Sequence, residues 1–259
     1  MNNYCDNKQV ETVQNVNYKG EIVHIPKFLY KYRSWSDIKH RELLLKGIVW
    51  FASPSSFEDV NDCHLREKIP KAKDFYRYLQ RYGIYQLSRQ QRREWSRKKA
   101  RDKKQLIAII QNARNEKDKR IGILSLTANE TNEKMWETYA NKHKGFCVEL
   151  NMERVLSAMT CSGGPVDYRE KLPIVESLCQ TEEDWLSIYY TKLAKYSFEE
   201  EYRLHKMVRE ESERSVSLTS DSFSKVILGN GLNDEEKNEA VKLIENGINC
   251  TIEEEQQRS

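Results

Sequence analysis

The chain contains 259 residues, of which 38% are hydrophobic and 32% are charged, and its formal net charge is +3. This content allows a real hydrophobic core in one large domain or two small ones. No apolar run of about 18 residues occurs, and residues 1–7 lack the basic and apolar regions of a signal peptide. We therefore expect a cytoplasmic protein with no membrane partner.

The six cysteines lie far apart in the sequence and form no Cys-x-x-Cys pair; they are Cys5, Cys63, Cys147, Cys161, Cys179 and Cys250. Zinc sites and disulfide frameworks both have characteristic cysteine spacings, and neither pattern is present. We expect reduced thiols and no bound metal.

The fold class expected from the order of elements is α+β, with small, mainly antiparallel sheets. Residues 1–20 are polar and rich in asparagine, which predicts a flexible leader or a short accessory strand. Residues 21–259 are predicted to form a single α+β domain. A basic helical insertion interrupts this domain at about 66–120.

The first strand of the domain is predicted over residues 28–33. Alternation places Tyr30 and Tyr32 on one face and Lys31 and Arg33 on the other. A helix is expected next, from about 38 to 45, with Ser34 or Ser36 as its N-cap and Gly47 as its stop. The strands expected after it are residues 48–52, 122–127, 225–229 and 249–253, and the helices are residues 152–159, 181–196 and 234–244.

The insertion at 66–120 carries 19 Lys or Arg against 6 Asp or Glu, whereas residues 151–259 carry 13 against 22. A solvated helix face is the simpler explanation of such a run, and a surface that docks nucleic acid phosphates is the alternative. Tyr82, Tyr85 or Trp95 would then stack on bases. The candidate nucleic-acid-binding residues are Arg89, Arg92, Arg93, Trp95, Lys98, Lys99 and Arg101.

Residues 135–150 read as a short helix followed by a strand. Trp136, Tyr139 and His143 are spaced to share one helix face, with Gly145 as the C-cap. Such a stripe can stack on a flat ligand beside a hydrogen-bonding imidazole. The simpler explanation for Trp136 is that it packs on the sheet.

Residues 198–204 read Phe-Glu-Glu-Glu-Tyr-Arg-Leu and predict a strand. On a strand, Glu199, Glu201 and Arg203 share one face, and the two carboxylates lie about 7 Å apart. Their repulsion raises one pKa unless Arg203 or Lys195 compensates. The simpler explanation is an edge strand that carries charge against aggregation.

Four motifs together resemble the DUF2971 domain family of bacteria, an uncharacterised family by its name. They are residues 135–150, Leu-Tyr-Lys-Tyr-Arg-Ser at 29–34, Val-Trp-Phe-Ala-Ser-Pro-Ser-Ser-Phe at 49–57 and the motif at 198–204. They span most of the chain in the family's order. One departure is that residues 58–62 read Glu-Asp-Val-Asn-Asp where the family usually has an Asn-Asp-Pro turn.

The order of these motifs is also similar to the layout of ADP-ribosyltransferase domains, which bind NAD between two halves of a split sheet. The resemblance implies that Arg33 or Tyr32 holds NAD, that Tyr139 stacks on nicotinamide, and that Glu201 positions the ribose. In this resemblance Ser53 supports the site and Glu199 orients the acceptor. Taken together with the ring stripe and the acidic motif, the candidate catalytic residues are Glu201, Glu199, Tyr139 and His143, and the candidate cofactor-binding residues are Lys31, Tyr32, Arg33, Ser53, Trp136 and Arg203.

The leading hypothesis is therefore an enzyme that uses NAD as a substrate to ADP-ribosylate a macromolecule, such as nucleic acid, in a toxin or phage-defence setting with an antitoxin or regulatory partner. The first alternative is a non-catalytic nucleic-acid-binding module. A third hypothesis is a metal-dependent nuclease that uses Glu199, Glu201 and Asp167 with a lysine.

Overall fold

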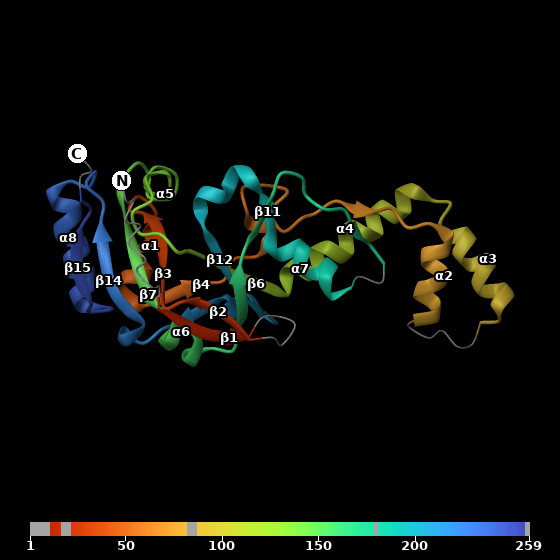
Figure 1. Cartoon of the computed structure of the whole chain (residues 1–259), viewed down its shortest axis with the longest axis horizontal. Coiled ribbons are helices and arrows are strands. Elements are labelled where there is room, and N and C mark those ends of the chain that lie inside the picture. The colour runs from red at the N-terminus through yellow and green to blue at the C-terminus, as the bar shows by residue number, and fades with distance from the viewer. Residues whose placement is uncertain (1–10, 17–21, 82–86, 179–180, 257–259) are drawn as a thin grey trace, which may run out of the picture.

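The body of the protein is built on one seven-stranded sheet (Figure 1). The structure, a computed structural model, describes residues 11–16, 22–81, 87–178 and 181–256. In spatial order the strands are β15 (Thr251–Glu254), β14 (Phe223–Leu228), β7 (Gly145–Asn151), β3 (Phe28–Ser34), β6 (Ile121–Thr127), β12 (Glu201–Met207) and β8 (Ser162–Pro165). Every neighbouring pair is antiparallel except β14 with β15. The predicted α+β class with a mainly antiparallel sheet is confirmed.

The sheet is divided near its middle. β3 pairs with β7 along its whole length, but it pairs with β6 only at Tyr30 opposite Thr127. Beyond this pair, Lys31 Nζ crosses to β6 and donates to the Ser125 carbonyl oxygen. The two halves of the sheet therefore separate on the side where Lys31 lies.

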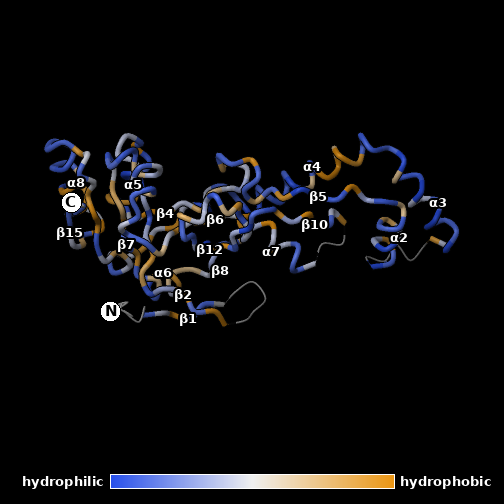
Figure 2. Tube along the Cα trace, turned by 45° about the horizontal axis from the view of Figure 1, so that its top comes forward, coloured by the Kyte–Doolittle hydropathy of each residue, from blue (hydrophilic) through white to orange (hydrophobic). Residues whose placement is uncertain are grey.

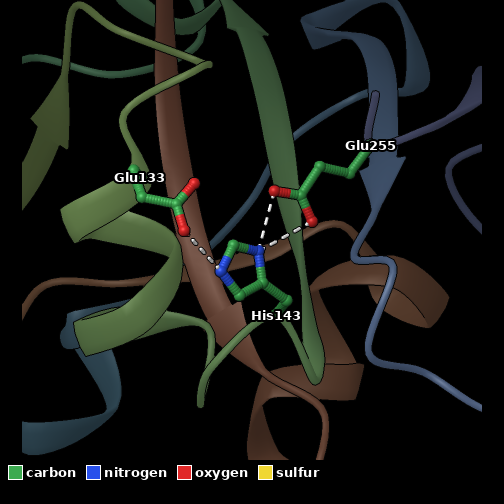
Figure 3. A group of neighbouring side chains, drawn as sticks. All are labelled: Glu133, His143 and Glu255. Atoms are coloured by element: carbon green, nitrogen blue, oxygen red, sulfur yellow. Dashed lines mark hydrogen bonds and ion pairs between the residues drawn. The ribbon is translucent and has the colours of Figure 1, made fainter. Parts of the chain in front are cut away.

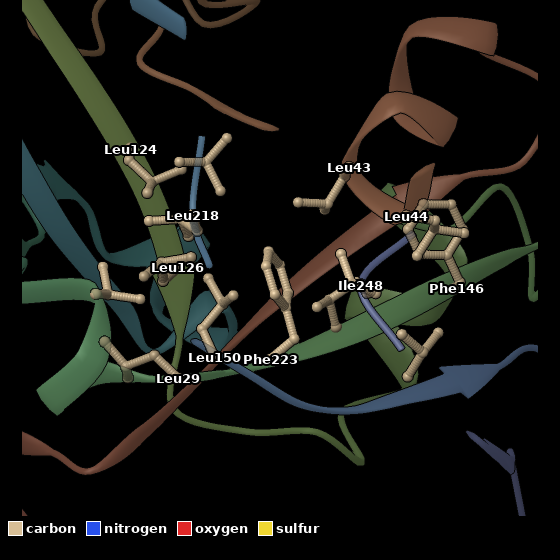
Figure 4. Packing of buried hydrophobic residues seen from close by; sticks show 14 of the residues in the cluster. Leu29, Leu43, Leu44, Leu124, Leu126, Phe146, Leu150, Leu218, Phe223 and Ile248 are labelled. Carbon is tan, nitrogen blue, oxygen red and sulfur yellow. The ribbon is translucent and has the colours of Figure 1, made fainter. Parts of the chain in front are cut away.

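The main hydrophobic core lies on one face of this sheet (Figure 4). Alternate residues Phe146, Val148 and Leu150 of β7 point into it, as a period of two requires. The helices that contribute to it are α1 (Ile38–Lys46), α6 (Met152–Ala158) and α8 (Asp234–Asn246). α1 begins with Asp37 as its N-cap rather than either predicted serine, and it ends at Gly47 as predicted.

Two smaller apolar clusters occupy the opposite face. One joins α5 (Glu133–Tyr139) to Tyr32 and Cys147, and the other joins α7 (Glu182–Tyr190) to Ile121 and Ile123. The candidate site lies on this second face, because Tyr139 and the side chains of Glu201 and Arg203 are on it.

The insertion forms an arm that extends away from the body (Figures 1 and 2). It contains β5 (Glu67–Lys68), α2 (Ala72–Arg81), α3 (Arg89–Lys99) and α4 (Lys103–Lys119), so the predicted helical character of residues 66–120 is confirmed for these helices. α2 and α3 pack together at the far end, and α4 returns the chain to β6. Arg114 of α4 ties the arm to its base through Glu67 and the Leu65 carbonyl oxygen.

Short elements complete the body. They are β1 (Thr12–Val16), β2 (Ile22–Pro26), β4 (Ile48–Trp50), η1 (Pro54–Ser56), β9 (Asp167–Arg169), β10 (Val175–Glu176), β11 (Thr191–Leu193), η2 (Ala194–Glu199), η3 (Glu211–Arg214), β13 (Ser215–Ser217) and η4 (Ser220–Ser222). Residues 12–16 form β1, which pairs with β2, so for this segment the structure shows the accessory strand and not the flexible leader of the two predicted alternatives. Residues 1–10 and 17–20 lie outside the described residues. No helix in the described part of the chain is long and apolar enough to cross a membrane.

Candidate functional site

Five charged residues from four segments of the chain form one buried cluster. Asp62 comes from the loop before β5, Lys192 from β11, Glu199 from the end of η2, and Glu201 and Arg203 from β12. None of the five is more than 8% exposed. Charges are rarely buried unless they are paired, so the geometry of the pairs determines what this cluster can do.

Arg203 is the most deeply enclosed member, at 1% exposed. Its Nε and Nη2 donate to the two oxygens of Glu201 at 2.7 and 3.0 Å, and Nη2 also lies 2.8 Å from both oxygens of Asp62. Nη1 donates to the Tyr189 carbonyl oxygen at 2.7 Å and contacts Cys63 Sγ at 3.1 Å. This guanidinium is saturated by protein groups and holds β12 against the Asp62 loop.

Lys192 is the second cation and joins all three carboxylates. Its Nζ lies 2.5 Å from Glu199 Oε2, 3.2 Å from Glu201 Oε2 and 3.3 Å from Asp62 Oδ2. Three carboxylates therefore face two cations in a region that excludes water. The excess negative charge makes one carboxylate easier to protonate than the others.

The pKa values of the two glutamates move in opposite directions. Burial alone would raise the pKa of Glu201, but the charges of Arg203 and Lys192 outweigh it and lower that pKa to about 2. Burial raises the pKa of Glu199 above its usual range, with Lys192 opposing and Glu201 reinforcing the change. Glu201 is thus ionised at neutral pH, whereas Glu199 is the member that takes up a proton more readily.

Tyr139, at the end of α5, closes the cluster toward solvent. Its hydroxyl donates to Glu199 Oε1 at 2.6 Å, although Tyr139 as a whole is 40% exposed. Burial and the adjacent Glu199 carboxylate raise the pKa of Tyr139, so its hydroxyl stays protonated and remains a donor. Lys31 approaches from the gap in the sheet, where burial and the nearby charge of Arg33 lower its pKa well below the usual range.

No family model matches this chain. No curated protein and no solved structure matches it either. The resemblance to the DUF2971 family therefore rests on the four motifs alone.

The acidic motif is not a continuous strand, so that part of the prediction is wrong. η2 ends at Glu199, and Glu200 adopts a left-handed backbone conformation with φ 43° before β12 begins at Glu201. Glu199 and Glu201 still meet, because Lys192 bridges them rather than because they alternate on one strand. Lys195, the other predicted counter-ion, is exposed and contacts the ring of Tyr196.

The predicted stripe of three rings on one helix face is also wrong. α5 ends at Tyr139, and Asn141, Lys142 and His143 all have positive φ in a left-handed turn. Gly145 is the first residue of β7 instead of a helix cap. The turn carries His143 away from the cluster.

Trp136 and Tyr32 are packed inside the body rather than offered to a ligand. The two rings meet edge to face at 5.0 Å, and each is 2% exposed. The simpler explanation of Trp136 therefore holds. The polar atoms of both rings already form hydrogen bonds with the backbone. Trp136 Nε1 donates to the Glu130 carbonyl oxygen, and the Tyr32 hydroxyl donates to the Asn129 carbonyl oxygen.

Arg33 and Ser53 also lie apart from the carboxylate pair. Arg33 is near Asp37 and His40, and burial lowers its pKa to about 10. The Ser53 hydroxyl bonds to the Asp118 carbonyl oxygen and to Ser55. Of the predicted residues, the cluster brings together Glu199, Glu201, Arg203, Tyr139 and, at its margin, Lys31.

Sequence reasoning missed Asp62 and Lys192. Asp62 ends the turn that departs from the family pattern, and that departure was the only available signal. The helix predicted over residues 181–196 includes Lys192, but α7 ends at Tyr190 and β11 carries Lys192 to the cluster.

A groove of about 270 Å³ lies next to the cluster but does not open onto its carboxylates. Gly164, Asp167, Arg169 and Thr191 are among its lining residues. Thr191 and Lys192 are consecutive in β11, so their side chains point to opposite sides of the ribbon that β9 and β11 form. This ribbon separates the groove from the charge cluster.

The nuclease hypothesis is not supported by this arrangement. Asp167 pairs with Arg169 beside the groove, and the ammonium of Lys192 occupies the position between Glu199 and Glu201 that a cation would take. In the described part of the chain, the one group with the spacing of metal ligands is Glu133, His143 and Glu255, which lies elsewhere. Cys63, Cys147, Cys161 and Cys250 are free thiols as expected, and Cys5 and Cys179 lie outside the described residues.

The predicted nucleic-acid-binding residues of the arm lie on two different faces of α3, one packed against α2 and one exposed to solvent. Arg92, Trp95 and Lys99 are half-buried on the inner face of α3, where Trp95 meets Phe75 of α2 edge to face at 5.9 Å. Base stacking by Trp95 is not supported, because its ring is already part of the α2–α3 contact. Tyr82 and Tyr85 lie outside the described residues.

The outer face of α3 is strongly basic. Exposed side chains at every fourth position line it, and the exposed basic residues of this face are Arg89, Arg93, Arg97, Lys98 and Arg101 just after the helix. Among the ion pairs of the described residues, none involves these five. Their charges are therefore available to a partner.

Proposed function

We propose that this protein is a cytoplasmic bacterial enzyme that transfers ADP-ribose from NAD to a macromolecule, in a toxin or phage-defence setting with an antitoxin or regulatory partner. The observation that carries the proposal is the hydrogen bond of 2.6 Å between Tyr139 and Glu199. It joins an aromatic ring and a carboxylate from two separate motifs, both of which the resemblance to ADP-ribosyltransferases implies as site residues. The separation of β3 from β6 beside this pair is in keeping with a split sheet.

The proposed reaction breaks the bond between ribose C1′ and the nicotinamide nitrogen. Nicotinamide leaves with the bonding electrons, a nucleophile of the acceptor forms a new bond to C1′, and its proton passes to a carboxylate or to water. Positive charge develops on the ribose in the transition state. A preorganised anion in a site that excludes water stabilises such charge strongly.

Glu199 is the better candidate for contact with the ribose than Glu201. Both oxygens of Glu201 are held by Arg203, which is 1% exposed and cannot move aside without breaking the cluster. One oxygen of Glu199 is held by the Tyr139 hydroxyl, which a ribose hydroxyl can replace. In this scheme Tyr139 covers the nicotinamide, while Glu201 is a positioning residue that fixes Lys192 and Arg203.

The test is label transfer from NAD carrying radioactive adenylate phosphate to RNA, DNA or lysate protein, together with nicotinamide release. Glu199→Gln should lower both by about 100-fold, the scale of losing one preorganised electrostatic group. Tyr139→Phe should raise the KM for NAD. Glu200→Gln is the matched control, because Glu200 belongs to the same triplet but is exposed.

Circular dichroism of each variant shows whether it is folded. Turnover by folded Glu199→Gln equal to that of the parent protein would refute the proposal. Cleavage of the RNA or DNA that stops on adding EDTA would favour the metal-dependent nuclease instead.

A second candidate function, nucleic acid binding through the arm, is favoured by the exposed basic face of α3. Side chains four residues apart on a helix are separated by about 6 Å along its axis, so Arg89, Arg93 and Arg97 can contact successive backbone phosphates. Binding of this kind has little sequence preference and weakens steeply with salt. In an ADP-ribosylating enzyme the arm would bind the nucleic acid that accepts ADP-ribose. In a non-catalytic module, nucleic acid binding by the arm would be the only function.

Fluorescence anisotropy with labelled RNA and DNA over a range of salt concentrations measures this binding without NAD. Reversing Arg89, Arg93 and Arg97 to glutamate should reduce the slope of log K against log salt by about 2 to 3, one for each lost phosphate contact. Reversing three exposed lysines of the body, Lys39, Lys142 and Lys242, is the control. Equal slopes for the two triple variants would remove the arm from the binding surface.

A further inference from the structure

The turn between α5 and β7 is fastened to the end of β15 by a histidine held between two carboxylates (Figure 3). His143 Nδ1 lies 2.8 and 3.0 Å from the two oxygens of Glu255, and His143 Nε2 lies 3.0 Å from Glu133 Oε1. Glu133 is the first residue of α5, and Glu255 directly follows β15. The three side chains join parts of the chain that are far apart in sequence.

The contact pattern fits the charged imidazolium and not the neutral ring. A neutral imidazole carries one N–H, so it donates to one carboxylate and presents a lone pair to the other. The imidazolium donates from both nitrogens. Burial alone would lower the pKa of His143, but the hydrogen bonds and charges of Glu255 and Glu133 outweigh it and raise that pKa.

Backbone hydrogen bonds extend the joint around these side chains. Glu255 Oε2 accepts the Asn230 N–H at 3.1 Å, and the His143 carbonyl oxygen accepts the Gly231 N–H at 3.1 Å. The Trp136 ring of α5 lies nearly parallel to the His143 ring, with an angle of 8° between the planes. The segment that carries Tyr139 is therefore connected to the C-terminal strand through His143.

A metal ion is the competing explanation of this arrangement, because one ring nitrogen of His143 and one oxygen from each glutamate lie within 4.8 Å of one another. Both ring nitrogens are, however, at hydrogen-bond distance from a carboxylate oxygen, which a charged imidazolium uses fully and a metal bound through one nitrogen does not. Zinc sites in proteins use three or four protein ligands. Within the described residues, no other charged side chain forms a hydrogen bond or ion pair with this ring.

We propose that His143 is a proton-operated latch, which holds the segment after β15 to α5 when the ring is charged and releases it when the ring is neutral. The charged groups that face the ring are Glu133 from α5 and Glu255 from the C-terminal segment; the loop after β14 contributes only uncharged groups, Asn230 and Gly231. The latch does not depend on the reaction proposed for Tyr139 and Glu199.

The sign of the pH effect follows from the protonated ring being the bound form. The stabilisation is fully present below the ordinary pKa of histidine and is lost as the pH rises through the raised pKa of His143. The end of β15 should therefore open at alkaline pH and close when the pH is lowered.

NMR titration of the histidine rings in the full chain tests the latch. The titration midpoint of His143 in the parent protein should fall when Glu255 is replaced in Glu255→Gln, because one of the two carboxylates that stabilise the charged ring is then lost. The amide of Glu255, which donates to the Leu228 carbonyl oxygen, should exchange at least about tenfold faster in His143→Gln at low pH, as the loss of a charge-assisted hydrogen bond implies. His24→Gln is the matched control.

A His143 midpoint that is the same in Glu255→Gln and in the parent protein would overturn the proposal. So would equal exchange of the Glu255 amide in His143→Gln and the parent protein. An increase in melting temperature on adding Zn²⁺ that is lost in His143→Gln would assign the ring to a metal site instead.

Discussion

Replacing Lys192 with methionine tests whether a central ammonium holds the charge cluster together. Lys192 Nζ lies within 3.3 Å of Asp62, Glu199 and Glu201, and its removal leaves three carboxylates facing Arg203 alone. Removing one partner of a buried ion pair costs about 3–5 kcal/mol, because an uncompensated charge stays buried. For a chain of this length each kcal/mol lowers the melting temperature by about 2–4 °C, so we expect a decrease of roughly 10 °C.

Urea unfolding followed by tryptophan fluorescence at neutral pH measures the loss. Lys195→Met is the matched control, because Lys195 is exposed three residues away, and its free energy of unfolding should change by less than about 0.5 kcal/mol. The penalty in Lys192→Met should shrink at mildly acidic pH, because Glu199, whose pKa is already raised, can then take up a proton. Equal unfolding midpoints for the two variants at neutral pH would show that Lys192 does not hold the charge cluster together.

Two further predictions concern acid stability and close packing. Because the pKa of Glu201 falls from 4.5 to about 2 on folding, ionised Glu201 should stabilise the fold by about 3 kcal/mol above pH 4.5, and this contribution should be lost as the pH falls through about 2. Urea unfolding across this pH range should show that Glu201→Gln lacks this acid-dependent loss of stability. The same acid profile in the variant and the parent protein would count against the ion pairs of Glu201. A Cβ at Gly145 would lie 2.2 Å from the Arg33 carbonyl oxygen, so Gly145→Ala should destabilise the fold by about 3 kcal/mol. In contrast, Gly164→Ala should change stability by less than about 0.5 kcal/mol, because a Cβ there meets nothing within 4 Å; similar thermal shifts for both alanine variants would contradict the packing argument.

The elements that could be predicted are those whose signal is local. Alternation along β3, the glycine stop of α1 at Gly47 and the basic helices of the arm all follow from period, caps and composition. These features depend on residues that are close in the sequence, so they can be predicted without knowing the tertiary structure. The strand predicted over residues 198–204 begins only at Glu201, because Glu200 adopts a left-handed backbone conformation. No local sequence pattern indicates this conformation.

The candidate site could be predicted only in part. The sequence pointed to Tyr139, Glu199, Glu201 and Arg203, because rings and carboxylates in short motifs are visible without a fold. It did not indicate that Lys192 would be their common partner. A long-range ion pair leaves no periodic trace in the chain.

By itself, the sequence determined the α+β class, the position and charge of the arm, and which carboxylates and rings were available for chemistry. Only the tertiary structure decided which of them meet. The Tyr139 hydroxyl bonds to Glu199, and His143 contacts Glu133 and Glu255 instead of the cluster. The Trp95 ring packs against Phe75 inside the arm. The physical reason is that secondary structure follows from forces between residues a few positions apart. The pairing of buried charges depends on the path of the whole backbone and on the exclusion of water that the finished fold provides.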